Sequence, residues 1–232
     1  FKAFAEQVEP STGLSADIPK TAAEHIAQLA RFSEIFQTFY DPGNHLRLAT
    51  FLRRLEAIDT TTVYPFLLYA YAGLMPYNKE EFDRILGLIE SYLIRRMVCG
   101  MTTKNYNRYF IDLMRALDKM GAITAANVID YMARSNSDST LFPNDSAFRS
   151  ATTDWPLYGR LAQYKVRAIL EALDAFAFHA KSDAIPLPPG LTIEHVMPQD
   201  WKAFWELADV DKADPLTEQK AIARRERLIH TL

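Results

Sequence analysis

The stretch from Asn78 to Met97, NKEEFDRILGLIESYLIRRM, carries the clearest helical pattern in this sequence of 232 residues. Its apolar residues recur every three or four positions, the spacing of one face of an α-helix: Phe82, Ile85, Leu86, Ile89, Leu93 and Met97. Asn78 is a typical N-terminal cap, and the acids that follow it favour the positive end of the helix dipole. Gly100 suits the left-handed residue that often ends a helix. The stretch therefore predicts an amphipathic helix with one buried face.

Similar patterns extend from this stretch in both directions. They predict helices over about 21–40, 46–55, 62–74, 103–120, 123–134 and 158–180. Hydrophobic residues make up 49% of the chain, which supports a sizeable core. Only 8 glycines are present, which disfavours an all-β fold rich in tight turns. We expect a mainly α fold that begins with a multi-helix domain.

Composition excludes several classes of protein. The single cysteine, Cys99, excludes a disulfide framework and a cysteine-based zinc cluster, and it fits a reducing, cytoplasmic setting. No apolar run reaches the roughly 18 residues that span a bilayer, so no membrane partner is expected. The net charge of -3 weakens a nucleic-acid-binding hypothesis without excluding a local basic face. Because the chain begins at Phe1 and not at a methionine, we interpret it as a fragment of a longer protein.

The sequence changes character near residue 184. A proline-rich linker, which ends at Pro189-Gly190, cannot continue a helix. Leu191–Val196 is short and rich in β-branched residues, which makes it the best strand candidate in the chain. Helical patterns return at about 201–208 and 216–232. We therefore expect a helical connector domain over 1–183 and a different module over 184–232.

Glu194 and His195 form the pair with the clearest chemical meaning. Hydrolysis of a phosphodiester at neutral pH needs a base that deprotonates water, and a histidine has a suitable pKa. It also needs a cation that neutralises charge on the phosphate, and a carboxylate binds hard cations well. At the end of a strand, neighbouring side chains can reach a shared site despite the pleat. The pair indicates metal-dependent hydrolysis, although a Glu-His pair also occurs by chance.

The run Glu194–Gln199, Glu-His-Val-Met-Pro-Gln, resembles the first motif of the His-Asn-His nuclease domain in GmrSD-type, modification-dependent (type IV) restriction endonucleases. Ser91–Gly100, followed by Lys104–Asn107, is similar to a helix and turn in the helical region of those enzymes. Tyr158-Gly159-Arg160 also fits. The resemblance covers roughly residues 20–232. It implies that the second module is the truncated N-terminal part of a ββα-metal nuclease domain.

The resemblance also implies a function, namely a metal-dependent endonuclease that restricts modified foreign DNA. His195 would be the general base, and Glu194 would hold a divalent Mg²⁺ or Mn²⁺ ion in a metal site that also includes His195. The family's middle Asn and final ligand would follow His230-Thr231-Leu232, where this sequence stops. A nucleoside triphosphate would act only through an N-terminal domain that this sequence lacks. The fragment alone is not expected to cut DNA.

Basic and aromatic residues could form the DNA-binding surface. Four of them lie near the expected nuclease module and could follow a DNA backbone or form a solvated helix face: Lys220, Arg224, Arg225 and Arg227. The basic stretch 95–119 has the same two interpretations, and the helix dipole alone explains Arg95 and Arg96. Trp201 and Trp205 are interpreted as core contacts between the two expected parts of the chain, with base stacking as the alternative.

Four histidines lie outside the Glu194-His195 pair. His230 fits either a solvated helix end or a site role. Three others lack companions at ligand spacing and are interpreted as structural or surface residues: His25, His45 and His179. The chain could instead be a non-catalytic helical scaffold or interaction module, or a regulatory relative whose nuclease half has decayed. An Asn-bearing strand encoded after Leu232 would separate these hypotheses. The sequence leaves the oligomeric state open.

Overall fold

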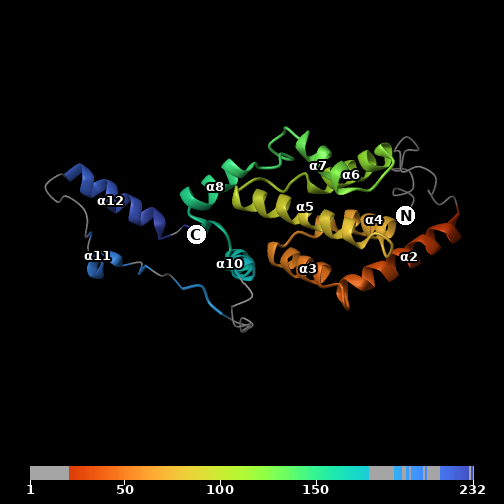
Figure 1. Ribbon diagram of the computed structural model, residues 1–232, viewed down its shortest axis with the longest axis horizontal. Helices are drawn as coiled ribbons and strands as arrows, with labels where there is room; N and C mark the ends of the chain where they lie inside the picture. Colours follow the sequence, from red (N-terminus) through yellow and green to blue (C-terminus); the bar gives the residue numbers. More distant parts are fainter. Residues whose placement is uncertain are drawn as a thin grey trace. The chain divides into compact units, whose positions relative to one another are not determined.

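The described part of this protein consists mainly of α-helices. The computed structural model describes residues 21–177, 191–194, 197–198, 200–205, 207, 215–229 and 231. These residues contain 11 α-helices, one short 3-10 helix and no β-strand (Figure 1). The chain divides into two compact units between Pro143 and Asn144. The expected domain boundary at 183 lies outside the described residues.

The first unit is a helical bundle whose elements follow the predicted order: α2 (Ala22–Tyr40), α3 (Leu46–Ile58), η1 (Thr61–Val63), α4 (Tyr64–Leu74), α5 (Lys79–Val98), α6 (Tyr106–Met120) and α7 (Ala125–Ala133). At the start of α2, the side chains and backbones of Thr21 and Glu24 cap each other. The side chain of Asn78 accepts from the backbone N–H of Glu81, which confirms the predicted cap of α5. The predicted stop at Gly100 is also confirmed, with φ of 66°.

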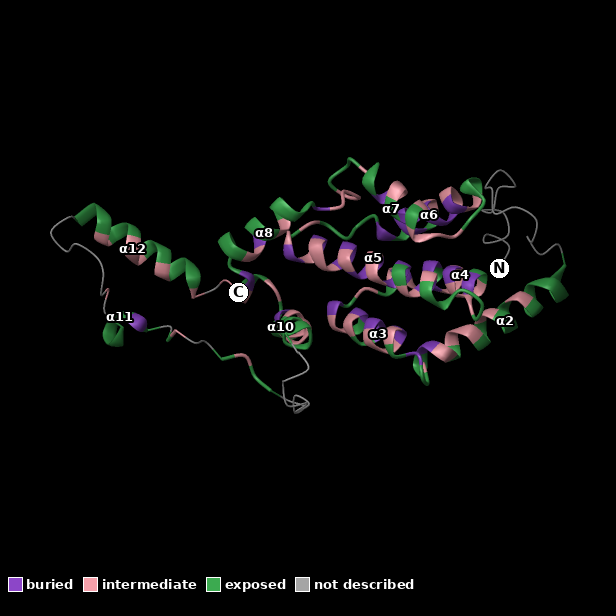
Figure 2. Cartoon of the chain, viewed as in Figure 1, coloured by how far each residue is buried: buried purple, intermediate pink, exposed green. Residues whose placement is uncertain are grey.

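Helix α5 lies at the centre of the first unit, where it packs against α3, α4 and α7. Its predicted apolar face is buried from Phe82 to Leu93, and Met97 packs half-buried against the same core. Figure 2 shows buried residues, in purple, along α5 and also along α6. Burial of one large apolar side chain contributes about 1.5–3 kcal/mol. The predicted helical core is therefore confirmed for this unit.

Polar contacts join α3 to α5 at the edge of this core. The guanidinium groups of Arg47 and Arg54 lie 2.5 and 2.6 Å from the two carboxylate oxygens of Glu90. These contacts pair the largely buried Glu90 carboxylate with two cations and so offset the cost of its burial.

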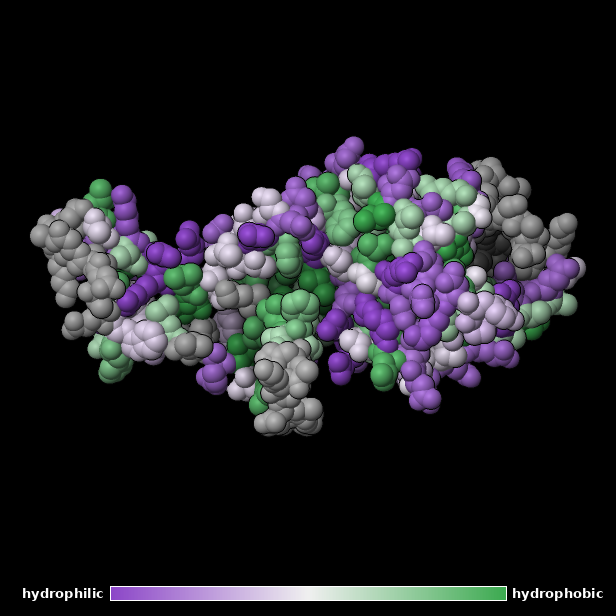
Figure 3. All heavy atoms as spheres, viewed as in Figure 1, coloured by the Kyte–Doolittle hydropathy of each residue, from purple (hydrophilic) through white to green (hydrophobic). Residues whose placement is uncertain are grey.

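The second unit contains five shorter or more exposed helices: α8 (Asp145–Asp154), α9 (Leu157–Arg160), α10 (Gln163–Ala177), α11 (Trp201–Phe204) and α12 (Pro215–Leu228). Helix α10 begins later than the predicted residue 158, because Tyr158 and Gly159 adopt non-helical backbone angles. Figure 3 shows hydrophobic side chains on the surface over α10, where Leu173 and Phe176 are exposed. None of the described helices combines the length and the apolarity that a bilayer crossing requires.

The predicted strand over Leu191–Val196 is not observed in its described part. Leu191–Glu194 form neither helix nor strand, and His195 and Val196 lie outside the described residues. A strand needs a neighbouring backbone to complete its hydrogen bonds. Here the Leu191 carbonyl accepts instead from the guanidinium of Arg167, at 3.0 Å. The strand prediction is therefore wrong for Leu191–Glu194, whereas the mainly helical fold class is confirmed for the described residues.

Candidate functional site

Glu194 is the one member of the predicted catalytic pair that the structure describes. Its side chain is exposed, and one carboxylate oxygen lies 3.4 Å from the hydroxyl of Thr192, which donates to it. Arg167 anchors the segment at Leu191, and an ion pair of 2.7 Å with Glu171 holds Arg167 within α10. A carboxylate with solvent access on a segment tied to a helix is available to a cation or to another ligand.

A cavity of about 340 Å³ lies beside Glu194. Residues distant in sequence meet there, because α9, α10, the residues Ile193, Glu194 and Met197, and the residues at and just after the end of α12 all contribute side chains. Most of the lining is apolar: Leu157, Val166, Leu170, Ile193, Met197, Leu228 and Ile229. Tyr158 and Thr231 add polar atoms. The cavity thus places a single carboxylate next to a largely apolar space.

A divalent metal fits the donor chemistry of Glu194, because Mg²⁺ and Mn²⁺ prefer oxygen ligands. Mg²⁺ is often held by one or two carboxylates and completes its shell with water and phosphate oxygens. In the part of the chain that the structure describes, no three His, Cys, Asp or Glu side chains are grouped as a metal site. His195, the other predicted ligand and the predicted general base, lies outside that part, as does His230.

The four basic residues predicted to contact DNA lie on different faces of α12. Lys220, Arg224 and Arg227 are exposed, and their spacing of four and three residues places them on one stripe. None of the ion pairs between described residues involves these three side chains. Arg225 instead lies over the ring of Trp201, at 5.1 Å from its centre, and donates to the Trp205 carbonyl at 2.8 Å. The stripe is available to an anionic partner, while Arg225 holds α12 against the tryptophan segment.

The two tryptophans lie in different environments. Trp201 is 3% exposed, which agrees with its interpretation as a core contact, here within the second unit. Trp205 is 44% exposed, so its interpretation as a core contact is wrong. Lys202, next to Trp201, forms an ion pair of 2.5 Å with Glu226 of α12. These contacts join the α11 segment to α12 and help to fix where the basic stripe lies.

The basic stretch 95–119 differs from its sequence interpretation at Arg96. Its guanidinium is completely buried and donates to three backbone carbonyl groups, of Leu141, Thr102 and Asp138, at 2.6, 2.7 and 3.1 Å. It also lies 5.4 Å from the centre of the Tyr92 ring. The helix dipole therefore does not account for Arg96, which ties two loops to the end of α5. Two other cations of the stretch, Arg108 and Arg115, form ion pairs with Asp112.

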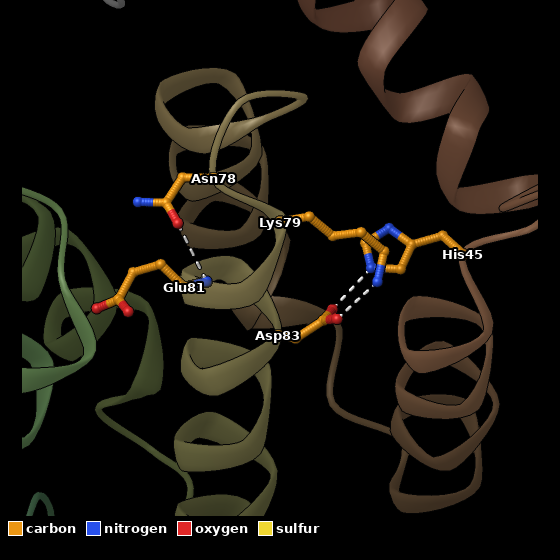
Figure 4. Close-up of polar contacts among 5 residues, drawn as sticks. All are labelled: His45, Asn78, Lys79, Glu81 and Asp83. Carbon is orange, nitrogen blue, oxygen red and sulfur yellow. Dashed lines mark hydrogen bonds and ion pairs between the residues drawn. The ribbon is translucent and has the colours of Figure 1, made fainter.

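His45 forms a polar contact with Asp83 that the sequence did not predict. It is 9% exposed, and its Nε2 atom lies 2.7 Å from the Asp83 carboxylate, whose second oxygen accepts from Lys79 at 2.8 Å (Figure 4). Burial raises the pKa of the Asp83 carboxyl, but the hydrogen bonds from Lys79 and His45 outweigh burial and leave this pKa below its usual value. The cluster fastens the start of α3 to α5, which fits the structural interpretation of His45.

Comparisons with known proteins add no relative, since no family model, no curated protein and no solved structure matches the chain. The resemblance carried by Glu194–Gln199 and by Ser91–Gly100 accordingly stays a prediction from the sequence.

Proposed function

We propose that this chain belongs to a metal-dependent DNA endonuclease that restricts modified foreign DNA. In this proposal His195 is the general base, Glu194 is a ligand of a Mg²⁺ or Mn²⁺ ion, and the exposed stripe of α12 contacts DNA phosphates. The helices of the first unit connect the nuclease module to a nucleotide-binding domain outside this sequence. Nucleotide binding there licenses the nuclease.

The observation that carries the proposal is the position of Glu194. This carboxylate directly precedes His195 in the sequence, and it lines one cavity with Leu228, the last residue of α12, and with Ile229, which follows that helix. The same helix carries Lys220, Arg224 and Arg227 on one exposed stripe. An acid for a cation and a row of cations for phosphates therefore belong to one small group of segments, an arrangement that phosphodiester hydrolysis needs.

The reaction follows from the chemistry of these groups. His195 takes a proton from a water molecule, and the resulting hydroxide attacks phosphorus while the bond to the leaving oxygen breaks. A divalent ion supplies charge neutralisation at the phosphate. Glu194 would hold that ion through its carboxylate, one oxygen of which accepts from the Thr192 hydroxyl.

A plasmid-cleavage assay on the full-length protein that contains this chain tests the proposal. With Mg²⁺ or Mn²⁺ present, His195→Ala should abolish cutting, and Glu194→Gln should weaken cutting and raise the metal concentration that it requires. His25→Ala is the matched control, because His25 is exposed on α2 and has no proposed role. Equal cutting by wild type and His195→Ala, with folded helical spectra for both, would favour a non-catalytic scaffold.

A further inference from the structure

A second cavity, of about 480 Å³, lies in the first unit where the end of α2, the length of α3 and the start of α4 converge. Its walls combine aromatic and charged side chains. Phe39, Tyr40 and Tyr64 supply the rings, and Leu52 and Leu55 contribute buried apolar surface. The chemistry proposed for Glu194 does not use this cavity.

Two of the aromatic rings that line the cavity pack against a neighbouring ring, Phe36. Tyr40 and Tyr64 both meet Phe36 edge to face, with ring centres 5.2 and 5.6 Å apart and interplanar angles of 86° and 71°. Tyr40 is 80% exposed, so much of its ring surface is open to a ligand. The face of an aromatic ring carries negative charge density and attracts a cation.

The charged side chains that line the cavity are Arg53, Glu56 and Asp59. Two carboxylates against one guanidinium leave an excess of one negative charge. Ion pairs between the described residues do not include any of these three side chains. Burial raises the pKa of the Tyr64 phenol, and Tyr40 and Glu56 raise it further. Tyr64 therefore stays neutral at physiological pH and presents an uncharged ring next to a carboxylate.

We propose that this cavity binds an alkylated ammonium group, as found in choline or in a trimethylated lysine side chain. Such a group has an apolar surface and a diffuse positive charge, which together match the aromatic rings and the excess negative charge of the lining. A small, strongly hydrated ion would lose more on leaving water, and an anion would face the excess negative charge. The proposal is independent of the nuclease hypothesis.

Titration of the 232-residue chain with choline, followed through the NMR signals of its tyrosine rings, tests the proposal. Choline should bind at millimolar concentration, and 3,3-dimethylbutan-1-ol, its neutral equivalent in shape, should bind about tenfold more weakly. A trimethyl-lysine amide is titrated in parallel. Whichever of choline and this amide binds more tightly indicates whether the natural ligand is a choline-like molecule or a trimethylated lysine side chain. Equal affinity for choline and the neutral alcohol would overturn the proposal.

Variants of the lining give a second, independent test. Tyr40→Leu should weaken choline binding by about fivefold, whereas Tyr77→Leu should leave it unchanged, because Tyr77 is 97% exposed and lies outside the cavity. Glu56→Gln should weaken binding and Arg53→Gln should strengthen it, each by a few-fold. If Glu56→Gln instead strengthened choline binding and Arg53→Gln weakened it, the cavity would not be a cation site and the proposal would be refuted. All four positions are exposed, so the variants are expected to fold.

Discussion

Replacement of Arg96 by methionine is the sharpest test of how the first unit is held together. Methionine keeps much of the apolar volume but removes every donor. The carbonyl groups of Leu141, Thr102 and Asp138 then lose their partner, and the Tyr106 hydroxyl loses a donor at 3.1 Å. A buried acceptor that loses its donor typically costs about 1–3 kcal/mol, and Arg96→Met leaves three carbonyl groups without this donor. A domain is stable by only about 5–15 kcal/mol, so the first unit should be severely weakened.

Urea denaturation can assign this loss to the correct unit. All three tryptophans lie in the second unit, so tryptophan fluorescence reports on that unit, while tyrosine near-ultraviolet circular dichroism reports mostly on the first. Arg96→Met should move the tyrosine transition to a much lower urea concentration, and the fluorescence without urea should stay that of a folded second unit. Arg108→Met is the matched control, because the Arg108 side chain is 86% exposed. A loss below about 1 kcal/mol, or one equal to that of the control, would refute the role given to Arg96.

Two further predictions concern charge. Because the pKa of Asp83 is lowered in the folded state, its carboxylate stabilises the fold above the unfolded pKa of about 3.9 and loses this contribution as the pH falls. Asp83→Asn should therefore have a lower free energy of unfolding than wild type at pH 7, and this difference should narrow below about pH 4. A difference that stays constant when urea denaturation is repeated at acid pH would contradict this prediction. Neutralisation of the α12 stripe should make the affinity for DNA less dependent on salt, so that the steepness of log affinity against log salt concentration falls by about three. A control triple variant at exposed arginines of the first unit should leave this steepness unchanged. The two variants are Lys220→Gln/Arg224→Gln/Arg227→Gln and Arg84→Gln/Arg108→Gln/Arg134→Gln.

Local patterns were sufficient to predict most of the helices. The six apolar residues of α5 and its cap at Asn78 lie within one stretch, so the sequence contains all that is needed to predict that helix. Helix α8 was missed because it is polar, with Ala151 as its only buried residue, and the cap Asn144 and the acid Asp145 were weak signals of its start. Helix α10 was predicted to begin too early because its apolar spacing does not show the backbone turn at Gly159.

Features that depend on distant residues could not be predicted. An arginine in the last turn of a helix is usually solvated, and the carbonyl groups that receive Arg96 come from loops up to 45 positions away. His45 likewise meets Asp83 across 38 positions, a separation that no spacing rule covers. The candidate site was found through the Glu194-His195 dipeptide, yet its cavity is built from segments between Leu157 and Thr231 whose meeting depends on the fold.

The contacts of the two arginines at the end of α5 also determine how far the first unit can be shortened. The last helix of that unit ends at Ala133, so a protein trimmed there would retain every helix of the bundle. It would nevertheless lose two of the three carbonyl acceptors of Arg96, and the Pro143 carbonyl that accepts from Arg95. The stretch from Asp138 to Pro143 is thus as necessary to an isolated first unit as any of its helices. A minimal version of the bundle should end at Pro143 or beyond.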